Sequence, residues 1–216
     1  MAESAATAGT TAGAGRDVAI DTAATFRSIG ELAEICGHYC WVERRIFEVA
    51  GSRASLPGSG DPEVGDPEVR VVLSQMSARH GLFAAQWRDR LPVRAGIDAE
   101  ALIVRPPGPL GPALDLIATE PRLALVLGGL ATQFLPSLRD AYRRHLEQAS
   151  PVSEAPVRAV LEWVDFSAGR ELHLAGLLLS RLAPDGERAR SARNFGTLVK
   201  RLLGNSADSF PGARAS

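Results

Sequence analysis

Four long segments of the sequence repeat apolar residues at helical spacing, and a proline-rich connection separates the second from the third. The segments span about residues 22–50, 67–90, 119–148 and 154–182. Apolar residues at intervals of three and four place one buried stripe on each helix. Helices of this length bury their stripes against one another, so the sequence predicts an all-α bundle of four long helices. A shorter fifth helix, about 187–203, carries apolar residues on one side and arginines on the other.

The connection between the second and third helices, about residues 91–118, is predicted to be extended. It contains Pro106, Pro107, Pro109 and Pro112. Proline inside a helix removes a hydrogen-bond donor and clashes with the preceding turn. A helix of 20–25 residues is about 30–38 Å long, and an extended chain easily covers that distance. The second and third helices are therefore predicted to run in the same direction. The short turn at 150–153 predicts antiparallel third and fourth helices.

Local signals predict where the helices begin, end and bend. Gly51 is predicted to stop the first helix, whereas Asp66 caps the second helix and Pro67 opens it. Pro136 is predicted to kink the third helix. The sequence divides into a disordered tail (1–20), one helical-bundle domain (21–204) and a flexible tail (205–216).

Composition argues against several classes of protein. The formal net charge of −1 provides no strong field for nucleic acid or an anionic membrane. No apolar run is long enough to cross a membrane. Phosphate-binding loops, dinucleotide-binding fingerprints and hydrolase nucleophile motifs do not occur in the sequence. The two cysteines, Cys36 and Cys40, are four residues apart on one predicted helix and are expected to be reduced thiols in a cytoplasmic protein.

Three polar side chains fall at positions that are predicted to face the core. Glu43 lies on the apolar stripe of the first helix, His80 lies on that of the second, and His173 faces inward from the fourth. A buried carboxylate or imidazole is unfavourable by several kcal/mol unless it is paired, hydrogen-bonded or bound to a metal. These three residues are therefore the starting point for any functional site.

The segment Cys36–Glu48, which reads Cys-Gly-His-Tyr-Cys-Trp-Val-Glu-Arg-Arg-Ile-Phe-Glu, resembles the first helix of the ferritin-like superfamily. The inward Glu43 stands in the middle of that helix. Two helical hairpins joined by a long crossover are also the connectivity of this superfamily. The resemblance extends over about residues 22–182 and implies a ferritin-like bundle with a metal–carboxylate centre in its core.

In the di-iron members of that superfamily, two helices each provide a glutamate and two others each provide Glu-x-x-His. Glu43 matches the first-helix glutamate, and His80 and His173 match the two histidines. The partner positions hold Ser77 and Arg170 instead of glutamate. The third helix offers Gln133 and Tyr142 as its nearest inward polar residues.

The fourth helix supplies two further carboxylates, Glu162 and Asp165. Asp165 lies two turns before His173, so both are predicted to face the core. A site of Glu43, His80, Asp165 and His173 would hold one Fe, Mn or Zn ion with an open position, and Fe or Mn is the metal that the resemblance favours. No other cofactor is predicted.

Two other interpretations use the same residues. In the first, Glu43 with His80, and Asp165 with His173 or Arg170, form buried pairs that fix helix register. In the second, they belong to a metal-free small-molecule pocket, where they bind a ligand or act as acid and base. The further residues predicted to line that pocket are Tyr39, Ser77, Gln133, Tyr142 and Glu162.

Two functional hypotheses follow. The first is a degenerate ferritin-like protein that acts as a non-catalytic scaffold for binding a ligand or another protein. The second is a divergent ferritin-like metal oxygenase or hydroxylase that acts on a small substrate. The missing glutamates at positions 77 and 170 favour the first hypothesis. The fifth helix either covers its own bundle or docks on a second copy of the chain, and neither nucleic acid nor membrane is an expected partner.

Overall fold

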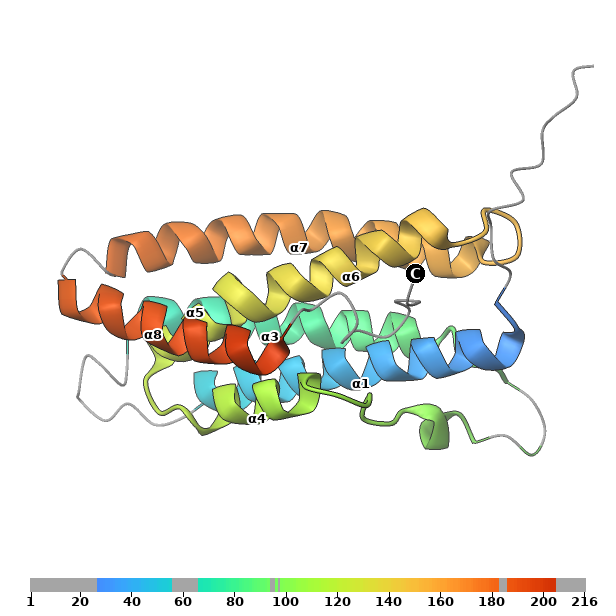
Figure 1. The fold of residues 1–216 in the computed structure, drawn as a ribbon, viewed down its shortest axis with the longest axis horizontal. Coiled ribbons are helices and arrows are strands. Elements are labelled where there is room, and N and C mark those ends of the chain that lie inside the picture. The colour runs from blue at the N-terminus through green and yellow to red at the C-terminus, as the bar shows by residue number, and fades with distance from the viewer. Residues whose placement is uncertain (1–26, 56–65, 94–95, 97, 183–185, 205–216) are drawn as a thin grey trace, which may run out of the picture.

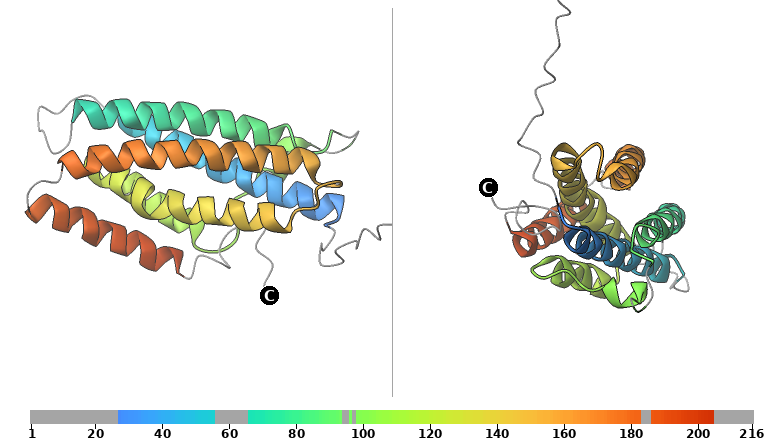
Figure 2. Two further views of the ribbon diagram at one scale, coloured as in Figure 1. Left: turned by 90° about the horizontal axis from the view of Figure 1, so that it is seen from above. Right: turned by 90° about the vertical axis from the view of Figure 1, so that its right-hand side faces the viewer.

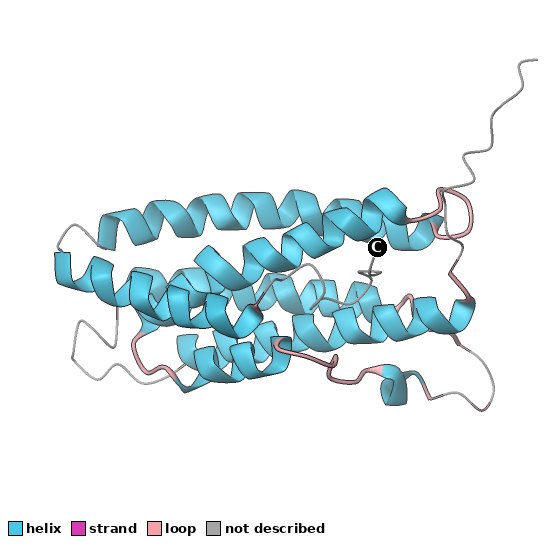
Figure 3. Cartoon of the chain, in the orientation of Figure 1, coloured by secondary structure: helices cyan, strands magenta, loops and turns pink. Residues whose placement is uncertain are grey.

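The computed structural model describes residues 27–55, 66–93, 96, 98–182 and 186–204. Within these residues the chain is all-helical and forms no strand (Figure 3). The predicted tails, 1–20 and 205–216, lie outside the described residues. In chain order the helical elements are α1 (Ile29–Ala54), α3 (Pro67–Arg88), η1 (Ala99–Leu102), α4 (Leu110–Thr119), α5 (Leu123–Gly129), η2 (Leu130–Phe134), α6 (Leu135–Gln148), α7 (Ala155–Leu182) and α8 (Gly186–Leu203).

The long helices lie side by side along one axis (Figure 1). The order of the colours shows that α1 and α7 run in one direction, and α3 and α6 in the other. α1 packs most extensively against α3, and α7 packs against both α6 and α3. In the end-on view of Figure 2, α4 and α8 lie outside this group; α4 contacts α1, and α8 contacts α5. The two outer helices therefore cover one side of the bundle.

The first helix begins at a well-formed cap. The Ser28 hydroxyl accepts a hydrogen bond from the backbone N–H of Glu31, and the Glu31 carboxylate accepts one from the backbone N–H of Ser28. This reciprocal arrangement satisfies two N–H groups that a helix start leaves unpaired. α1 begins at Ile29, immediately after this cap, and the predicted start at residue 22 lies outside the described residues.

The prediction that Gly51 stops the first helix is also wrong, because α1 continues to Ala54. Packing explains why glycine occupies position 51, because a Cβ atom there would lie 2.7 Å from the Ser77 hydroxyl of α3. Ser77 itself donates a hydrogen bond to the carbonyl of Phe47 at 2.9 Å. A glycine thus allows the two helices to approach closely. The predicted start of the second helix is confirmed, with Asp66 as the cap and Pro67 as the first helical residue.

The connection from α3 to α5 returns along the outside of α1, but it is not extended throughout. It contains the short 3₁₀ helix η1 and the helix α4. Pro109 precedes α4, and Pro112 lies in its first turn, where proline removes no intrahelical hydrogen bond. The prediction of an extended segment up to residue 118 is wrong because it treated prolines that begin a helix as prolines that forbid one.

The third predicted helix is present as α5, η2 and α6 in direct succession. η2 is a π-helical turn, in which the backbone N–H of Leu135 donates to the carbonyl of Leu130, five residues earlier. Pro136 follows in the first turn of α6. A wider turn accommodates the ring and the missing N–H of a proline. The disturbance predicted at Pro136 therefore takes the form of a π turn just before it.

The fifth helix covers the bundle of its own chain. α8 packs against α5, α4 and η2, with Val199 and Leu203 buried. A Cβ atom on Gly129 of α5 would lie 2.8 Å from the Phe195 ring, so α8 approaches α5 closely at this point. None of the helices in the described ranges is long and apolar enough to cross a membrane.

Candidate functional site

Glu43, in the middle of α1, is the centre of a buried polar network. Its side chain is fully buried, and its Oε1 accepts a hydrogen bond from the Tyr142 hydroxyl at 2.5 Å. Its Oε2 contacts Nδ1 of His80. Since Tyr142 belongs to α6 and His80 to α3, one carboxylate joins three helices. An O–H donor at this distance from a carboxylate makes a strong, charge-assisted hydrogen bond.

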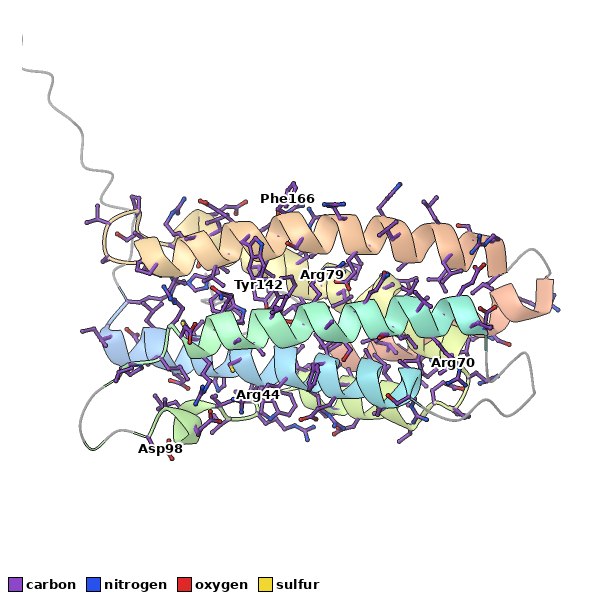
Figure 4. The ribbon with its side chains drawn as sticks, turned by 180° about the vertical axis from the view of Figure 1, so that it is seen from behind. Arg44, Arg70, Arg79, Asp98, Tyr142 and Phe166 are labelled. Carbon is purple, nitrogen blue, oxygen red and sulfur yellow. The ribbon has the colours of Figure 1, made fainter. Side chains whose placement is uncertain are left out.

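Glu171 of α7 extends the network on the opposite side of the His80 ring. Glu171 is 3% exposed, its Oε2 lies 3.3 Å from Nε2 of His80, and its Oε1 lies 2.7 Å from an Nη atom of Arg79. Both are ion-pair distances. Within the part of the chain that the structure describes, Nε2 of His80 and both Glu171 oxygens lack an aligned hydrogen-bond partner. Figure 4 shows Arg79 and Tyr142 between α3 and α7.

The charges in this network balance. Burial alone lowers the pKa of His80, but the Glu43 carboxylate and then Glu171 raise it more strongly, to about 10. His80 is therefore a cation at neutral pH. With His80 and Arg79 positive and the two carboxylates negative, the network is neutral as a whole. A neutral, mutually paired set of charges is the form in which ionisable groups are stable in a protein interior.

A second buried network lies nearer the end of the bundle at which α1 begins. The Tyr39 hydroxyl lies 3.1 Å from Nδ1 of His145, and Nε2 of His145 lies 3.3 Å from Glu154. Arg27 forms an ion pair with Glu154 at 3.1 Å. Burial and the nearby Arg27 lower the pKa of His145 to about 4, so this imidazole is neutral. A neutral ring that accepts from Tyr39 and donates to Glu154 satisfies both contacts.

The combined contribution of His80 and His145 to stability is predicted to be greatest near pH 6.5, the ordinary pKa of histidine. The folded-state pKa of His80 is raised to about 10, so its contribution is complete below pH 6.5 and is lost as the pH rises towards 10. The folded-state pKa of His145 is depressed to about 4, so its contribution is complete above pH 6.5 and is lost as the pH falls towards 4.

Urea unfolding of the wild type, His80→Gln and His145→Gln between about pH 4 and pH 10 tests this prediction. The difference in unfolding free energy between the wild type and His80→Gln should shrink as the pH rises above 6.5. The corresponding difference for His145→Gln should shrink as the pH falls below 6.5. A difference for His80→Gln that does not change with pH would contradict the assignment of a buried imidazolium.

The structure does not bring the two other predicted metal ligands to Glu43 and His80. His173 is exposed, so the prediction that it faces inward is wrong. Asp165 instead accepts hydrogen bonds from Arg139 at 2.7 Å and from Arg143 at 2.8 Å, both on α6. Burial raises the pKa of Asp165, but these two arginines lower it more strongly. Asp165 therefore joins α6 to α7 at the side of the bundle.

The residues predicted to line a pocket lie at different places in the structure. Tyr142 donates a hydrogen bond to Glu43, and the Tyr39 ring lies edge-on to the Tyr142 ring with ring centres 4.8 Å apart. Ser77 bonds the backbone of α1, as described above. Gln133 is half-buried beside Gly196 of α8, and Glu162 is exposed and lies 3.8 Å from Arg158. Gln133 and Glu162 therefore do not contribute to the Glu43 network.

Glu171 is a buried member of the network that was not predicted, although the spacing of apolar residues in α7 indicates it. Apart from Val160, the buried residues of α7 alternate at intervals of four and three: Val157, Leu161, Val164, Ala168, Glu171, Ala175 and Leu178. The match of His173 to the histidine of a Glu-x-x-His motif predicted that His173, and not Glu171, faces the core. Two residues further along a helix a side chain points about 200° away, so His173 and Glu171 cannot both face the core.

The arrangement does not fit the predicted metal site. Glu43 and Glu171 lie on opposite edges of the His80 ring, so the two carboxylates cannot share one ion with a single imidazole nitrogen. In the described ranges no group of three or more His, Cys, Asp or Glu side chains is placed to hold a metal ion. The network is instead a chain of Tyr142, Glu43, His80, Glu171 and Arg79.

Comparison with known proteins adds no family assignment. No family model matches the chain, and neither a curated protein nor a solved structure matches it significantly.

Proposed function

We propose that this chain is a divergent ferritin-like bundle that acts as a non-catalytic scaffold for protein association. The directions of α1, α3, α6 and α7, and the long connection between α3 and α5, support the ferritin-like connectivity. The Glu43 network supports the non-catalytic part of the proposal. Both Glu43 oxygens and Nδ1 of His80 are engaged within the protein, in a neutral cluster that joins four helices.

The observation that carries the proposal is an exposed apolar stripe on α7, which we call the α7 stripe. It consists of Trp163, Phe166, Leu174 and Leu177, which are 41%, 68%, 50% and 59% exposed. At about 100° per residue these four side chains lie within about 80° of one another around the helix. Figure 4 shows Phe166 pointing away from the bundle. Several large apolar side chains exposed on one face of a helix indicate an interaction surface.

The spacing of the α7 stripe suits a second copy of the same chain. Trp163 and Leu177 stand symmetrically about Arg170 in the sequence, and so do Phe166 and Leu174. Two α7 helices packed antiparallel would place each aromatic residue opposite a leucine of the other copy. Such a self-complementary patch is what a two-fold symmetric dimer requires. The long aliphatic stem of Arg170 can lie across the contact while its charged end reaches solvent.

Sedimentation velocity of the full chain tests this proposal. We expect the wild type to be a dimer at micromolar concentration, and Phe166→Glu with Leu174→Glu to be a monomer with unchanged helical content. Val71→Glu is the matched control, because Val71 is 56% exposed on α3 and lies outside the α7 stripe. A wild type that stays monomeric, or a Val71→Glu variant that dissociates equally, would overturn the dimer.

The oxygenase hypothesis keeps one supporting observation. Nε2 of His80 and both Glu171 oxygens are buried and make ion-pair contacts but no aligned hydrogen bonds among the described residues, so a bound ligand or water would complete their hydrogen bonding. Anaerobic titration with Fe(II) or Mn(II) distinguishes the two functions. Stoichiometric binding that His80→Ala abolishes would favour the oxygenase, and the absence of binding would favour the scaffold.

A further inference from the structure

A surface segment between α3 and α4, residues 98–104, lies against the outside of the bundle. It contains the 3₁₀ helix η1, and we call it the η1 strap. In Figure 1 it is the short green turn beside α1. Ala99, Leu102 and Ile103 are half-buried against the core, and the other strap residues are exposed. The strap therefore packs on the bundle through one side only.

One carboxylate fastens the η1 strap to two helices. Glu100 accepts hydrogen bonds from Arg44 of α1 at 2.8 and 3.1 Å, and from Arg88 of α3 at 2.6 Å. The side chains of Arg44, Glu100 and Arg88 are 38%, 45% and 55% exposed. Water and salt compete with ion pairs that are exposed in this way. The attachment of the strap is therefore sensitive to its ionic surroundings.

No backbone hydrogen bond joins the η1 strap to α1 or α3 among the described residues. The N–H groups of Ala101, Ile103 and Val104 donate to carbonyls of the strap itself, and that of Glu100 donates to the Asp98 side chain. A segment with only local backbone bonds can separate from its neighbours while the helices keep all of theirs. The side chain of Glu100 and the apolar contacts alone hold the strap closed.

The strap covers Cys40 of α1. At about 100° per residue, Gly37, Cys40 and Arg44 fall within about 60° of one another around the helix. The strap meets this face at Gly37, which lies against the Leu102 carbonyl, and at Arg44. The Cys40 thiol donates to the carbonyl of Ala84, one turn before Arg88 of α3. Cys40 is fully buried, because the strap is attached to α1 before and after it and to α3 beside it.

Cys36 is a second buried thiol with a different environment. It points about 100° away from Gly37 around α1, towards the core, and it is also fully buried. Burial raises the pKa of Cys40 to about 11 and that of Cys36 to about 12, so both covered thiols are protonated and unreactive. Opening of the strap would expose Cys40, whereas Cys36 needs separation of the helices.

We propose that the η1 strap is a cover that opens transiently while the bundle remains folded, and that Glu100 sets how often it opens. Opening uncovers the groove between α1 and α3 with the Cys40 thiol inside it. Because the fastening is a cluster of exposed ion pairs, opening increases with ionic strength. The device lies on α1 and α3 and does not depend on dimer formation through the α7 stripe.

Thiol labelling of the full chain with dithiodipyridine, a neutral aromatic disulfide, tests the proposal. Cys36→Ala leaves Cys40 as the only thiol, and Cys40→Ala leaves Cys36. The cysteine thiolate attacks the reagent, which forms a mixed disulfide with the protein and releases one pyridine thiolate. The protection of each thiol is its labelling rate in the unfolded protein divided by that in the folded protein. This ratio is compared with the unfolding constant of the same protein from urea unfolding.

We expect the protection of Cys36 to equal the unfolding constant of its protein, because this thiol reacts only after global unfolding. The protection of Cys40 should be at least about tenfold smaller than the unfolding constant, because opening of the strap is sufficient for its reaction. Equal protection and unfolding constants for Cys40 would overturn the proposal, since the strap would then open only when the whole bundle unfolds.

Glu100→Gln shows whether Glu100 fastens the strap. We expect about tenfold faster labelling of Cys40 and an unchanged rate at Cys36, because both arginine pairs are lost. Glu48→Gln is the matched control, because Glu48 makes an exposed pair with Arg45 of α1 at 3.1 Å, away from the strap. Raising the salt concentration to about 1 M should also accelerate Cys40 labelling, without any substitution at Glu100. A Cys40 rate that neither Glu100→Gln nor salt changes would overturn the role of Glu100.

Discussion

Glu43→Gln is expected to lower the free energy of unfolding by about 3–5 kcal/mol, the range found when one partner of a buried ion pair is removed. The substitution keeps the shape of the side chain but removes its charge. The His80 imidazolium then loses the nearer of its two carboxylates, and the Tyr142 hydroxyl loses a charged acceptor. All three groups are almost completely buried, so water cannot replace the lost interactions.

Equilibrium urea unfolding of the wild type and Glu43→Gln at neutral pH measures this loss of unfolding free energy. Glu162→Gln is the matched control, because Glu162 is exposed on α7 and its contact with Arg158 spans 3.8 Å. An exposed pair of this kind contributes at most about 1 kcal/mol. If the two substitutions had equal effects, the Glu43 network would not stabilise the fold.

Gly37→Ala is expected to destabilise the protein by about 1–3 kcal/mol, as overpacking of a core typically does. A Cβ atom at Gly37 would lie 2.0 Å from the backbone carbonyl oxygen of Leu102. That carbonyl cannot simply rotate away, because the η1 segment is held in place. Glu100 of η1 accepts hydrogen bonds from Arg44 of α1 at 2.8 Å and from Arg88 of α3 at 2.6 Å. Figure 4 shows Arg44 and Asp98 on this side of the bundle.

Gly111→Ala provides the comparison for this prediction. A Cβ atom there would lie 1.9 Å from Nε of Arg105, a contact of similar closeness. The neighbour is the end of a flexible, exposed side chain that can move away. Thermal unfolding should therefore show a lower midpoint for Gly37→Ala and an unchanged or higher midpoint for Gly111→Ala. A reversed order would mean that the connection is not fixed against α1.

The sequence predicted the features that depend on spacing along one helix. The apolar stripes located the long helices, Asp66 and Pro67 located the start of α3, and Glu43 and His80 were identified as buried polar residues. Each of these signals is contained within a few consecutive turns. Periodicity and capping residues along the chain are therefore sufficient to predict that part of the fold and of the network.

The partners of those residues could not be predicted in the same way. Glu171 and His173 are two residues apart, and a helix can turn only one of them towards Glu43 and His80; the choice depends on how α7 is rotated against α3. Asp165 likewise accepts hydrogen bonds from two arginines of a neighbouring helix and does not face the predicted metal site. Helix rotation is set by packing between elements, and this information is spread over several distant segments.

The Glu43 network divides its charges between the two helical hairpins in a way that bears on how the chain assembles. The α1–α3 hairpin contains Glu43, Arg79 and His80 and so contributes one net positive charge to the centre of the bundle. The α6–α7 hairpin contributes Tyr142 and the negative Glu171. Each hairpin alone leaves charge or polar groups exposed on its apolar face. Docking is therefore favoured in the one register in which Glu171 neutralises the net positive charge of the α1–α3 hairpin. A shifted register would leave an unpaired charge in the core.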